Sequence, residues 1–205
     1  MLPAVIFHYG HCLFIKQYSM IFKPSPLKNV MVVIPEFRTD ERGGFARIFC
    51  EKEFAERGMN HHLSQGNIAY NHKKGTLRGM HYQLPPMGES KLVQCTRGSV
   101  FDVVIDLRKD SPTYLQHFSI ELNADNRIAL YVPEMFAHGY LTLTDDVEMT
   151  YLVSTPYSPE HERGVRYNDP AFNIQWPMSV EMISGKDNNW ALFIQEENTN
   201  QTTKT

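Results

Sequence analysis

An arginine, a histidine and a lysine occur together between Gly75 and Arg108, on short segments typical of β-strands. Arg78 and His81 are three residues apart, so in a regular strand they point to opposite faces unless a bulge intervenes. Lys91 follows after a Pro-Pro-Met-Gly connection. An anion-binding cation, a group that titrates near neutral pH and a second cation are what proton transfer on a negatively charged substrate requires. This stretch is therefore the first candidate for a functional site.

The segments that must position these residues recur along the chain. From residue 30 onward, short runs rich in β-branched and aromatic residues follow one another at intervals of about ten residues, with turn residues at several junctions. This spacing predicts an all-β antiparallel sandwich or barrel. One helix is predicted at residues 50–58, where CEKEFAERG ends on Gly58, a common helix stop. We therefore expect one β domain with a short helical insertion.

The two ends of the chain are expected to lie outside this domain. The interpretation divides the chain into an N-terminal extension at 1–29, the β domain at 30–190 and a C-terminal tail at 191–205. The apolar start is interrupted by histidines and a lysine and lacks the basic segment of a signal peptide, and Met20 is an equally good start residue. The polar tail ENTNQTTKT has nothing to bury and is predicted to be frayed.

Alternate residues share a face in the strand-like run SVFDVVIDLR. One face is wholly apolar and is expected to lie in the core; it carries Phe101, Val103, Ile105 and Leu107. The other face carries Asp102 and Asp106, which could look into a polar interior or into solvent. We expect solvent for both, because carboxylates are rarely buried.

The charge balance excludes one class of partner. With 20 Lys and Arg against 23 Asp and Glu, the chain lacks the basic field of a nucleic-acid-binding protein, so any bound anion must be held by a local cluster. No segment reaches the roughly 18 uninterrupted apolar residues of a membrane-spanning helix. The three cysteines are widely spaced and odd in number, which argues against a disulfide framework and predicts a cytoplasmic protein.

The short motifs argue against a metal site, a serine hydrolase and a nucleotide-binding loop. Nine histidines invite a metal site, but Gln83 stands two residues after His81, where barrel metal sites usually place a second histidine. His138 has no accompanying ligand set. The chain contains no nucleophile elbow, phosphate loop or dinucleotide fingerprint. Acid–base chemistry remains.

Longer motifs run in order along the chain: KGTLRGMHYQ, KLVQCTRGSVFDVVIDLRKDSPT, VPEMFAHGYLTL, TYLVSTPYSPE, then ND at 168–169, QWP at 175–177 and SGKD at 184–187. This series, from about residue 30 to residue 190, strongly resembles the dTDP-4-dehydrorhamnose 3,5-epimerase family. The resemblance implies a cupin-type jelly roll (a double-stranded β-helix), a homodimer, and no metal or cofactor. It also implies epimerisation at C3 and C5 of a nucleotide-linked 4-keto-6-deoxyhexose, with dTDP-4-dehydro-6-deoxy-D-glucose as the expected substrate.

The resemblance further implies roles for individual residues. His81 would be the base that removes the proton from C3 or C5, Asp187 would orient its imidazole, and Tyr151 would donate the returning proton. Lys91 would lie near the C4 oxygen, and the ring of Tyr157 would stack on the thymine. Other substrate contacts are implied for Arg42, Gln65, Asn67, Arg78, His138, Glu162 and Lys186.

These residue types suit the implied reaction on chemical grounds. A proton beside a ketone is weakly acidic, so its removal needs a cation that stabilises the developing enolate oxygen. Inversion also needs a second group that returns a proton from the opposite face of the ring. A histidine and a tyrosine across a sugar would meet this need, and a carboxylate would set the histidine tautomer.

Two stretches depart from the family pattern. Arg47, in DERGGFARIF, stands where the family has a substrate-contacting glutamate, and Ala69 and Asn71 stand where it tends to have serines. Three alternatives therefore stay open. They are an epimerase of one centre or of a related nucleotide sugar, a catalytically silent jelly roll that binds sugar nucleotides, and a ketoisomerase of the same fold.

Overall fold

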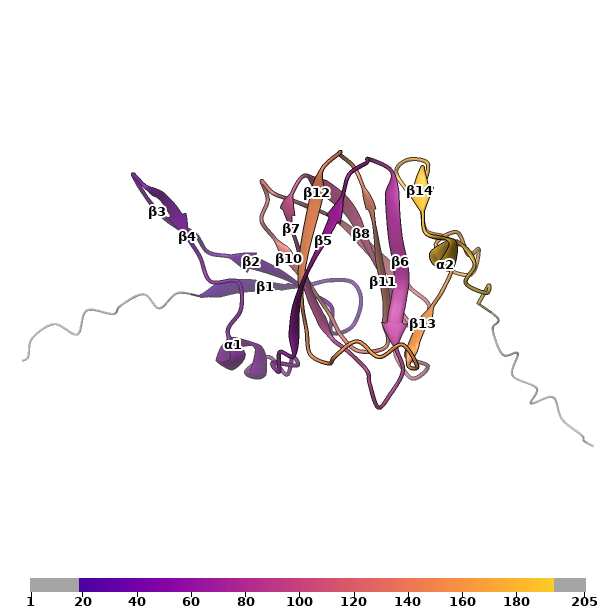
Figure 1. Cartoon of the computed structure of the whole chain (residues 1–205). Coiled ribbons are helices and arrows are strands. Elements are labelled where there is room, and N and C mark those ends of the chain that lie inside the picture. Colours follow the sequence, from indigo (N-terminus) through magenta and orange to yellow (C-terminus); the bar gives the residue numbers. More distant parts are fainter. Residues whose placement is uncertain (1–18, 194–205) are drawn as a thin grey trace, which may run out of the picture.

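Two sheets packed face to face form the body of the protein (Figure 1). The structure is a computed structural model, and it describes residues 19–193. Strands that follow one another mostly lie in opposite sheets: β5 (Gln65–Asn71) and β7 (Lys91–Arg97) belong to the first, β6 (Thr76–Gln83) and β8 (Ser99–Asp106) to the second. The predicted all-β fold is confirmed. Because consecutive strands mostly lie in opposite sheets, residues close in sequence can line both sides of a space between the sheets.

The first sheet has the strand order β1 (Met20–Pro24), β2 (Met31–Pro35), β10 (Ala129–Val132), β7, β12 (Val147–Val153) and β5. The second has the order β13 (Glu162–Gly164), β6, β11 (Phe136–Thr142), β8 and β9 (His117–Asn123), and β14 (Met182–Ile183) pairs in parallel with β6. A separate hairpin, β3 (Arg38–Asp40) and β4 (Gly43–Phe45), projects away from the body (Figure 1).

The two helices within residues 19–193 are short. α1 (Glu51–Ala55) lies inside the predicted 50–58 segment but is shorter, and turns carry the chain on to Gly58, whose φ of 67° favours glycine. Phe54 anchors α1 by packing its ring edge-on against Tyr131. α2 (Gly185–Asn188) is capped by the Ser184 hydroxyl, which accepts a hydrogen bond from the backbone amide of Asp187.

The first sheet includes residues that the sequence interpretation assigned to the N-terminal extension. β1 pairs antiparallel with β2, with Met20 opposite Pro35, and Met20 is buried in the same cluster as Phe54. The run MIFKP is short and ends in proline, so its strand signal could not be separated from the apolar residues before it. Residues 1–18, which make up most of the extension, and residues 194–205 of the tail lie outside the described residues.

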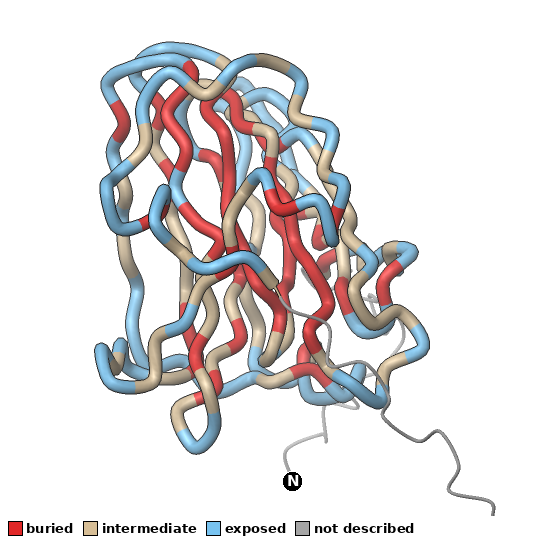
Figure 2. The backbone as a smooth tube through the Cα atoms, turned by 90° about the vertical axis from the view of Figure 1, so that its right-hand side faces the viewer, coloured by how far each residue is buried: buried red, intermediate tan, exposed pale blue. Residues whose placement is uncertain are grey.

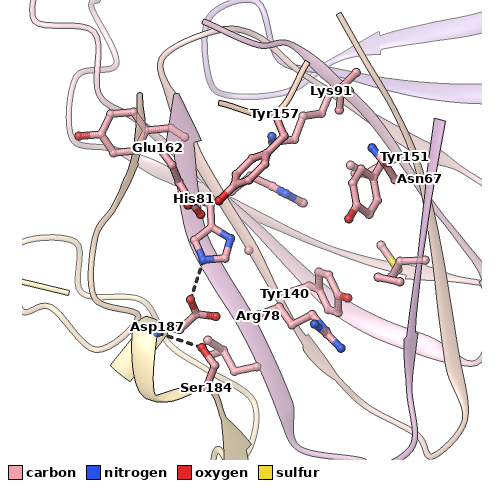
Figure 3. Close-up of a pocket in the computed structure, with 18 of the residues that line it drawn as sticks. Asn67, Arg78, His81, Lys91, Tyr140, Tyr151, Tyr157, Glu162, Ser184 and Asp187 are labelled. Carbon is pink, nitrogen blue, oxygen red and sulfur yellow. Dashed lines mark hydrogen bonds and ion pairs between the residues drawn. The ribbon is translucent and has the colours of Figure 1, made fainter. Parts of the chain in front are cut away.

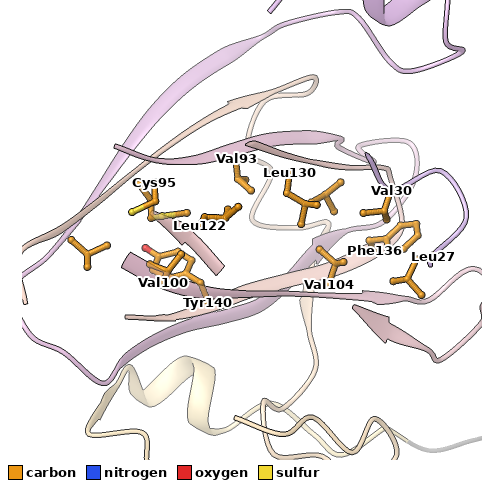
Figure 4. Close-up of a cluster of buried hydrophobic side chains, with 13 residues drawn as sticks. Leu27, Val30, Val93, Cys95, Val100, Val104, Leu122, Leu130, Phe136 and Tyr140 are labelled. Atoms are coloured by element: carbon orange, nitrogen blue, oxygen red, sulfur yellow. The ribbon is translucent and has the colours of Figure 1, made fainter. Parts of the chain in front are cut away.

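Apolar side chains fill much of the space between the two sheets (Figure 4). This cluster consists of Leu27, Val30, Val93, Cys95, Val100, Val104, Leu122, Leu130, Val132, Phe136, Tyr140, Val147 and Met149. Figure 2 shows the same pattern along the backbone, with buried residues concentrated in the central strands. Because apolar burial drives folding and interiors are closely packed, the cluster holds the two sheets at a set separation.

The expectation that the two aspartates of β8 face solvent was wrong. The apolar face of this strand is core, as predicted, but it packs outward against a later segment that contains Val165 and Phe172. Asp102 and Asp106 lie on the other face and are fully buried. Asp102 is bonded to His138, and Asp106 is bonded to a cluster of neighbouring polar side chains. β8 is thus covered on both faces, and the covering segment has little regular structure that a sequence pattern could reveal.

Candidate active site

A pocket of about 790 Å³ opens between the two sheets (Figure 3). Every site residue predicted from the sequence lines it, with the exception of Arg42. These residues are Gln65, Asn67, Arg78, His81, Lys91, His138, Tyr151, Tyr157, Glu162, Lys186 and Asp187. Both sheets contribute, because Lys91 and Tyr151 come from the first and His81 from the second. A ligand in the pocket would therefore be held between two walls that carry different groups.

A bulge in β6 brings Arg78 and His81 into the same pocket. On the partner strand β11, residues 138 and 140 pair with His81 and Arg78, so three steps along β6 match two along β11. Gly79 lies within the extra step, with a φ of 127°. A Cβ added there would lie 2.5 Å from a Cα atom of β11, so the position strongly favours glycine. The bulge that allows Arg78 and His81 to share one face of the strand is therefore present.

His81 is paired with Asp187 on the wall formed by β6 and α2. Its Nε2 atom lies 2.7 Å from Oδ1 of Asp187, and Oδ2 of Asp187 accepts a hydrogen bond from the Gly79 amide. Burial would raise the pKa of Asp187, but the hydrogen bond and charge of His81, with the Gly79 amide, hold that pKa below its usual value. An ionised Asp187 keeps the His81 proton on Nε2, which leaves Nδ1 to act as a base.

Lys91 reaches the pocket from β7 and forms an ion pair with Glu89. Both side chains are almost fully buried. Burial lowers the pKa of Lys91 to about 7, while the negative charge of Glu162 acts in the opposite direction. An ammonium group in such surroundings stabilises negative charge on a nearby ligand oxygen more strongly than an exposed one, because water screens it less.

Tyr151 stands across the pocket from His81 (Figure 3). It lies on β12, opposite Asn67 of β5 and Val93 of β7, and is partly buried. Because β12 and β6 belong to different sheets, Tyr151 and His81 would contact opposite faces of a ring held between them. The arrangement can provide a base on one side of a ligand and a proton donor on the other.

Glu162 links two other residues at the mouth of the pocket. Its carboxylate accepts a hydrogen bond of 2.6 Å from the Tyr157 hydroxyl and forms an ion pair with Lys186. Burial raises the pKa of Glu162, but the bonds from Lys186 and Tyr157 outweigh it and leave that pKa below its usual value. Tyr157 is 57% exposed, and Gln65 accepts a hydrogen bond from its backbone amide at 3.2 Å. Its ring is thus held in place and open to stacking.

The sequence interpretation missed a second histidine–aspartate pair. Nε2 of His138 lies 2.9 and 3.1 Å from the two carboxylate oxygens of Asp102. Burial raises the pKa of Asp102, against the opposing charge and hydrogen bond of His138. Strand alternation was the one available signal, since it placed Asp102 on the face opposite the apolar one. No sequence pattern predicts a pocket on this face, so a polar interior could not be distinguished from solvent. Tyr140 and Glu89 also line the pocket, and Asn71 donates a hydrogen bond to the Tyr140 oxygen; the sequence interpretation gives none of the three a role.

Two arginines of the DERGGFARIF motif at residues 40–49 lie away from the pocket. Arg42 belongs to the β3–β4 hairpin and is bonded to Asp40, with its Nε atom 3.1 Å from Oδ1. Arg47, at the position of the family glutamate, donates a hydrogen bond of 3.1 Å to Glu53 of α1. The reversed charge at position 47 is therefore balanced, at least in part, by a carboxylate of the same chain.

The order of motifs, the fold and the pocket can be compared with known proteins. The sequence profile of dTDP-4-dehydrorhamnose 3,5-epimerases matches residues 24–195. The chain belongs to the dTDP-4-dehydrorhamnose 3,5-epimerase family. A member of that name from Sinorhizobium fredii is 42% identical, over 82% of this chain and 87% of its own length. A dTDP-4-dehydrorhamnose 3-epimerase from Streptomyces niveus is 37% identical, over 86% of this chain and 85% of its own length.

The structure agrees with this membership of the epimerase family. A crystal structure of dTDP-4-dehydrorhamnose 3,5-epimerase from Bacillus anthracis, with TDP and PPi bound, is 36% identical and superposes with a TM-score of 0.82. The match covers 85% of this chain and 100% of that chain. The expected cupin-type jelly roll is confirmed. Within residues 19–193, no three histidine, cysteine or acidic side chains are grouped to hold a metal ion, and no helix is long and apolar enough to cross a membrane.

Proposed function

We propose that the protein epimerises dTDP-4-dehydro-6-deoxy-D-glucose at C3 and C5 and so forms dTDP-4-dehydro-L-rhamnose. The observation that carries the proposal is the His81–Asp187 pair on one wall of a pocket whose other wall presents Tyr151 and Lys91. Membership of the epimerase family supports the same reaction.

The first step removes a proton beside the C4 ketone. Nδ1 of His81 takes the proton from C3 or C5, the C–H electron pair moves toward C4, and negative charge develops on the C4 oxygen. The Lys91 ammonium stabilises this enolate oxygen. Asp187 stabilises the imidazolium through the hydrogen bond at Nε2.

The second step returns a proton from the opposite face. The Tyr151 hydroxyl gives its proton to the carbon, which inverts the centre, and the enolate electron pair forms the new C–H bond. The imidazolium then loses its proton, and the phenolate is protonated again before the second centre reacts. A single base could not do this efficiently, because it would return the proton to the face from which it came.

The nucleotide end of the substrate is proposed to lie at the mouth of the pocket, with the thymine against the exposed ring of Tyr157. The remaining contacts proposed for the substrate are Gln65, Asn67, Arg78, His138, Glu162 and Lys186, all of which line the same pocket. Lys186, which is ion-paired with Glu162 at the mouth of the pocket, provides positive charge for the diphosphate.

We also propose that the protein is a cytoplasmic homodimer in which the β3–β4 hairpin of one subunit reaches the other. The hairpin leaves the body of the protein (Figure 1) and exposes Phe45 by 63%, and Ile68 on the edge strand β5 is 69% exposed. Exposed apolar groups of this size commonly mark an interface. This arrangement would bring Arg42 to the pocket of the second subunit, which would explain its place in the motif.

Solvent exchange in deuterium oxide tests the reaction. Wild-type protein incubated with dTDP-4-dehydro-6-deoxy-D-glucose is expected to introduce deuterium at both C3 and C5, measured by NMR and mass spectrometry, because each inversion takes its new proton from a solvent-exchanging group. His81→Asn should abolish the label at both carbons. Asp125→Asn, in an exposed turn, is the control that should leave it unchanged.

The distribution of the label separates the alternatives. Label at one carbon would identify an epimerase of a single centre, as the name of the Streptomyces niveus relative describes. Tight binding of dTDP without any label would identify a silent binding protein and reject the proposed activity. A product with its ketone at C3 would identify a ketoisomerase.

A further inference from the structure

Tyr140 has a hydroxyl group at the pocket that none of the proposed steps uses. It lies two residues from His138 on β11, so both side chains point to the interior between the sheets. Its ring is part of the apolar core, whereas the residue also lines the pocket, where Figure 3 shows it beside Arg78. The hydroxyl therefore lies at the boundary between core and cavity, where few partners are within reach.

Asn71 determines the direction in which this hydroxyl can donate. Oδ1 of Asn71 accepts a hydrogen bond of 2.7 Å from Nε of Arg78, and Nδ2 donates one of 3.2 Å to the Tyr140 oxygen. The opposite orientation of the amide would place its NH₂ group against the guanidinium N–H, so Arg78 sets the orientation. The Tyr140 oxygen is thus an acceptor for Asn71, and its own O–H must donate elsewhere.

The Tyr140 O–H has no acceptor among residues 19–193, so a ligand in the pocket is the partner left to it. Burial raises the pKa of Tyr140 to about 12, although the hydrogen bond from Asn71 and the charge of Arg78 act in the other direction. The nearby hydroxyl of Tyr151 and the carboxyl of Asp102 add to the increase. The phenol is therefore protonated at neutral pH and can serve as a donor, not as a base.

We propose that Tyr140 donates a hydrogen bond to an oxygen substituent of the hexose ring and is a specificity-determining residue for the sugar half of the substrate. The proposal rests on the function proposed above. A ring held between His81 and Tyr151 presents its hydroxyl and ketone oxygens at its edge, toward the walls of the pocket. Tyr140 and Arg78, joined through Asn71, offer two donors on one such wall. The proposed nucleotide site at Tyr157 lies at the mouth and makes no use of them.

The test compares binding of the sugar nucleotide with binding of the nucleotide alone. In a His81→Asn background, which prevents turnover, Tyr140→Phe removes only the hydroxyl. It is expected to weaken binding of dTDP-4-dehydro-6-deoxy-D-glucose by about tenfold, the effect of one lost hydrogen bond, and to leave dTDP binding within about twofold, both measured by calorimetry. Tyr131→Phe is the matched control. Tyr131 is also 5% exposed and accepts a hydrogen bond from the Asn60 amide, but it does not line this pocket.

A second variant tests the direction of donation. Asn71→Asp replaces the amide donor with an acceptor of the same shape, which would draw the Tyr140 proton away from the pocket. It should weaken sugar binding by as much as Tyr140→Phe, and the double variant should show no further loss. Three results would each overturn the proposal. They are an equal loss of affinity for the sugar nucleotide and for dTDP, an unchanged affinity for the sugar nucleotide, and additive losses from Tyr140→Phe and Asn71→Asp. Because the measurements need no turnover, a failure of the exchange assay is a separate result that rejects only the proposed reaction.

Discussion

The two histidines of the pocket each have an aspartate partner, but the two aspartates are in different electrostatic states. The pKa of Asp187 is held below its usual value by the bonds that it receives, whereas burial raises the pKa of Asp102. An ionised Asp187 is suited to stabilise a positive charge that appears on His81 during proton transfer. Asp102 is less suited to stabilise a positive charge on His138, because burial disfavours its charged form. This difference favours His81 as the base in a pocket that contains two histidines.

Replacing Asp187 with asparagine should separate catalysis from binding. The amide would present N–H groups to Nε2 of His81, so the imidazole would carry its proton on Nδ1 and could not act as a base there. We expect kcat to fall by about 10²- to 10⁴-fold, the range seen when the orienting carboxylate of a histidine is lost. Initial rates at saturating substrate measure the effect, and calorimetry should show dTDP affinity unchanged. A kcat within twofold of wild type would contradict the assigned role.

The pH dependence of kcat/KM should report on Lys91. Burial lowers the pKa of Lys91 from the usual 10.5 to about 7, so the ammonium form dominates below that pH and is lost as pH rises through it. If the ammonium stabilises the enolate, kcat/KM must have a falling limb near pH 7. Glu89→Gln removes the paired anion that favours the ammonium, so the limb should move to lower pH. Exposed Glu160→Gln is the control, and a limb that Glu89→Gln does not move would exclude Lys91 as its source.

Strand β6 positions His81, the proposed base, by means of a bulge that lies close against β11. Regular alternation would place Arg78 and His81 on opposite faces, and the extra residue at Gly79 reverses this. The same glycine donates its amide to Asp187. One irregular step in a strand therefore supports both Arg78, which is proposed to bind the substrate, and the His81–Asp187 pair.

Gly79→Ala should damage both stability and activity. Its φ of 127° is unfavourable for alanine, and the added Cβ would lie 2.5 Å from a Cα atom of β11. We expect the free energy of unfolding in urea to decrease by roughly 2–4 kcal/mol, from backbone strain and overpacking together. Gly185→Ala is the matched control, since an added Cβ there meets nothing within 4 Å. If Gly79→Ala unfolds with the same free energy as the wild type, β6 and β11 can adjust to accept a side chain at position 79, and the predicted strain is absent.

Much of the DERGGFARIF motif at residues 40–49 lies on the β3–β4 hairpin, which does not return to the pocket of its own subunit. Arg42 lies on this hairpin, whereas the other predicted site residues line the pocket. In a homodimer this arrangement would make each site depend on two chains. Light scattering should therefore give the mass of a dimer.

Mixing two inactive variants tests whether the hairpin acts between subunits. Arg42→Ala lacks the hairpin contact, and His81→Asn lacks the base. If Arg42 serves the other subunit, each mixed dimer contains one complete site, so refolding an equimolar mixture should restore about a quarter of wild-type activity. Mixing without subunit exchange is the control and should restore none. No recovery after verified exchange would show that Arg42 does not act in the second subunit.

Alternation and turn residues were sufficient to predict the all-β fold and the apolar face of β8, whereas most residues of the pocket were implied by the resemblance of the ordered motifs to the epimerase family. Alternation and turn residues act over a few residues, so they can be read without knowing which strands meet. Tertiary structure alone decided that Asp102 is buried, that Asn71 aligns Tyr140, and that Arg42 lies outside the pocket. The hydrogen bonds of Asp102 and of Asn71 join residues 36 and 69 positions apart. Such contacts depend on which strands pair and on which segments cover each sheet. Neither can be predicted from the residues adjacent in the sequence.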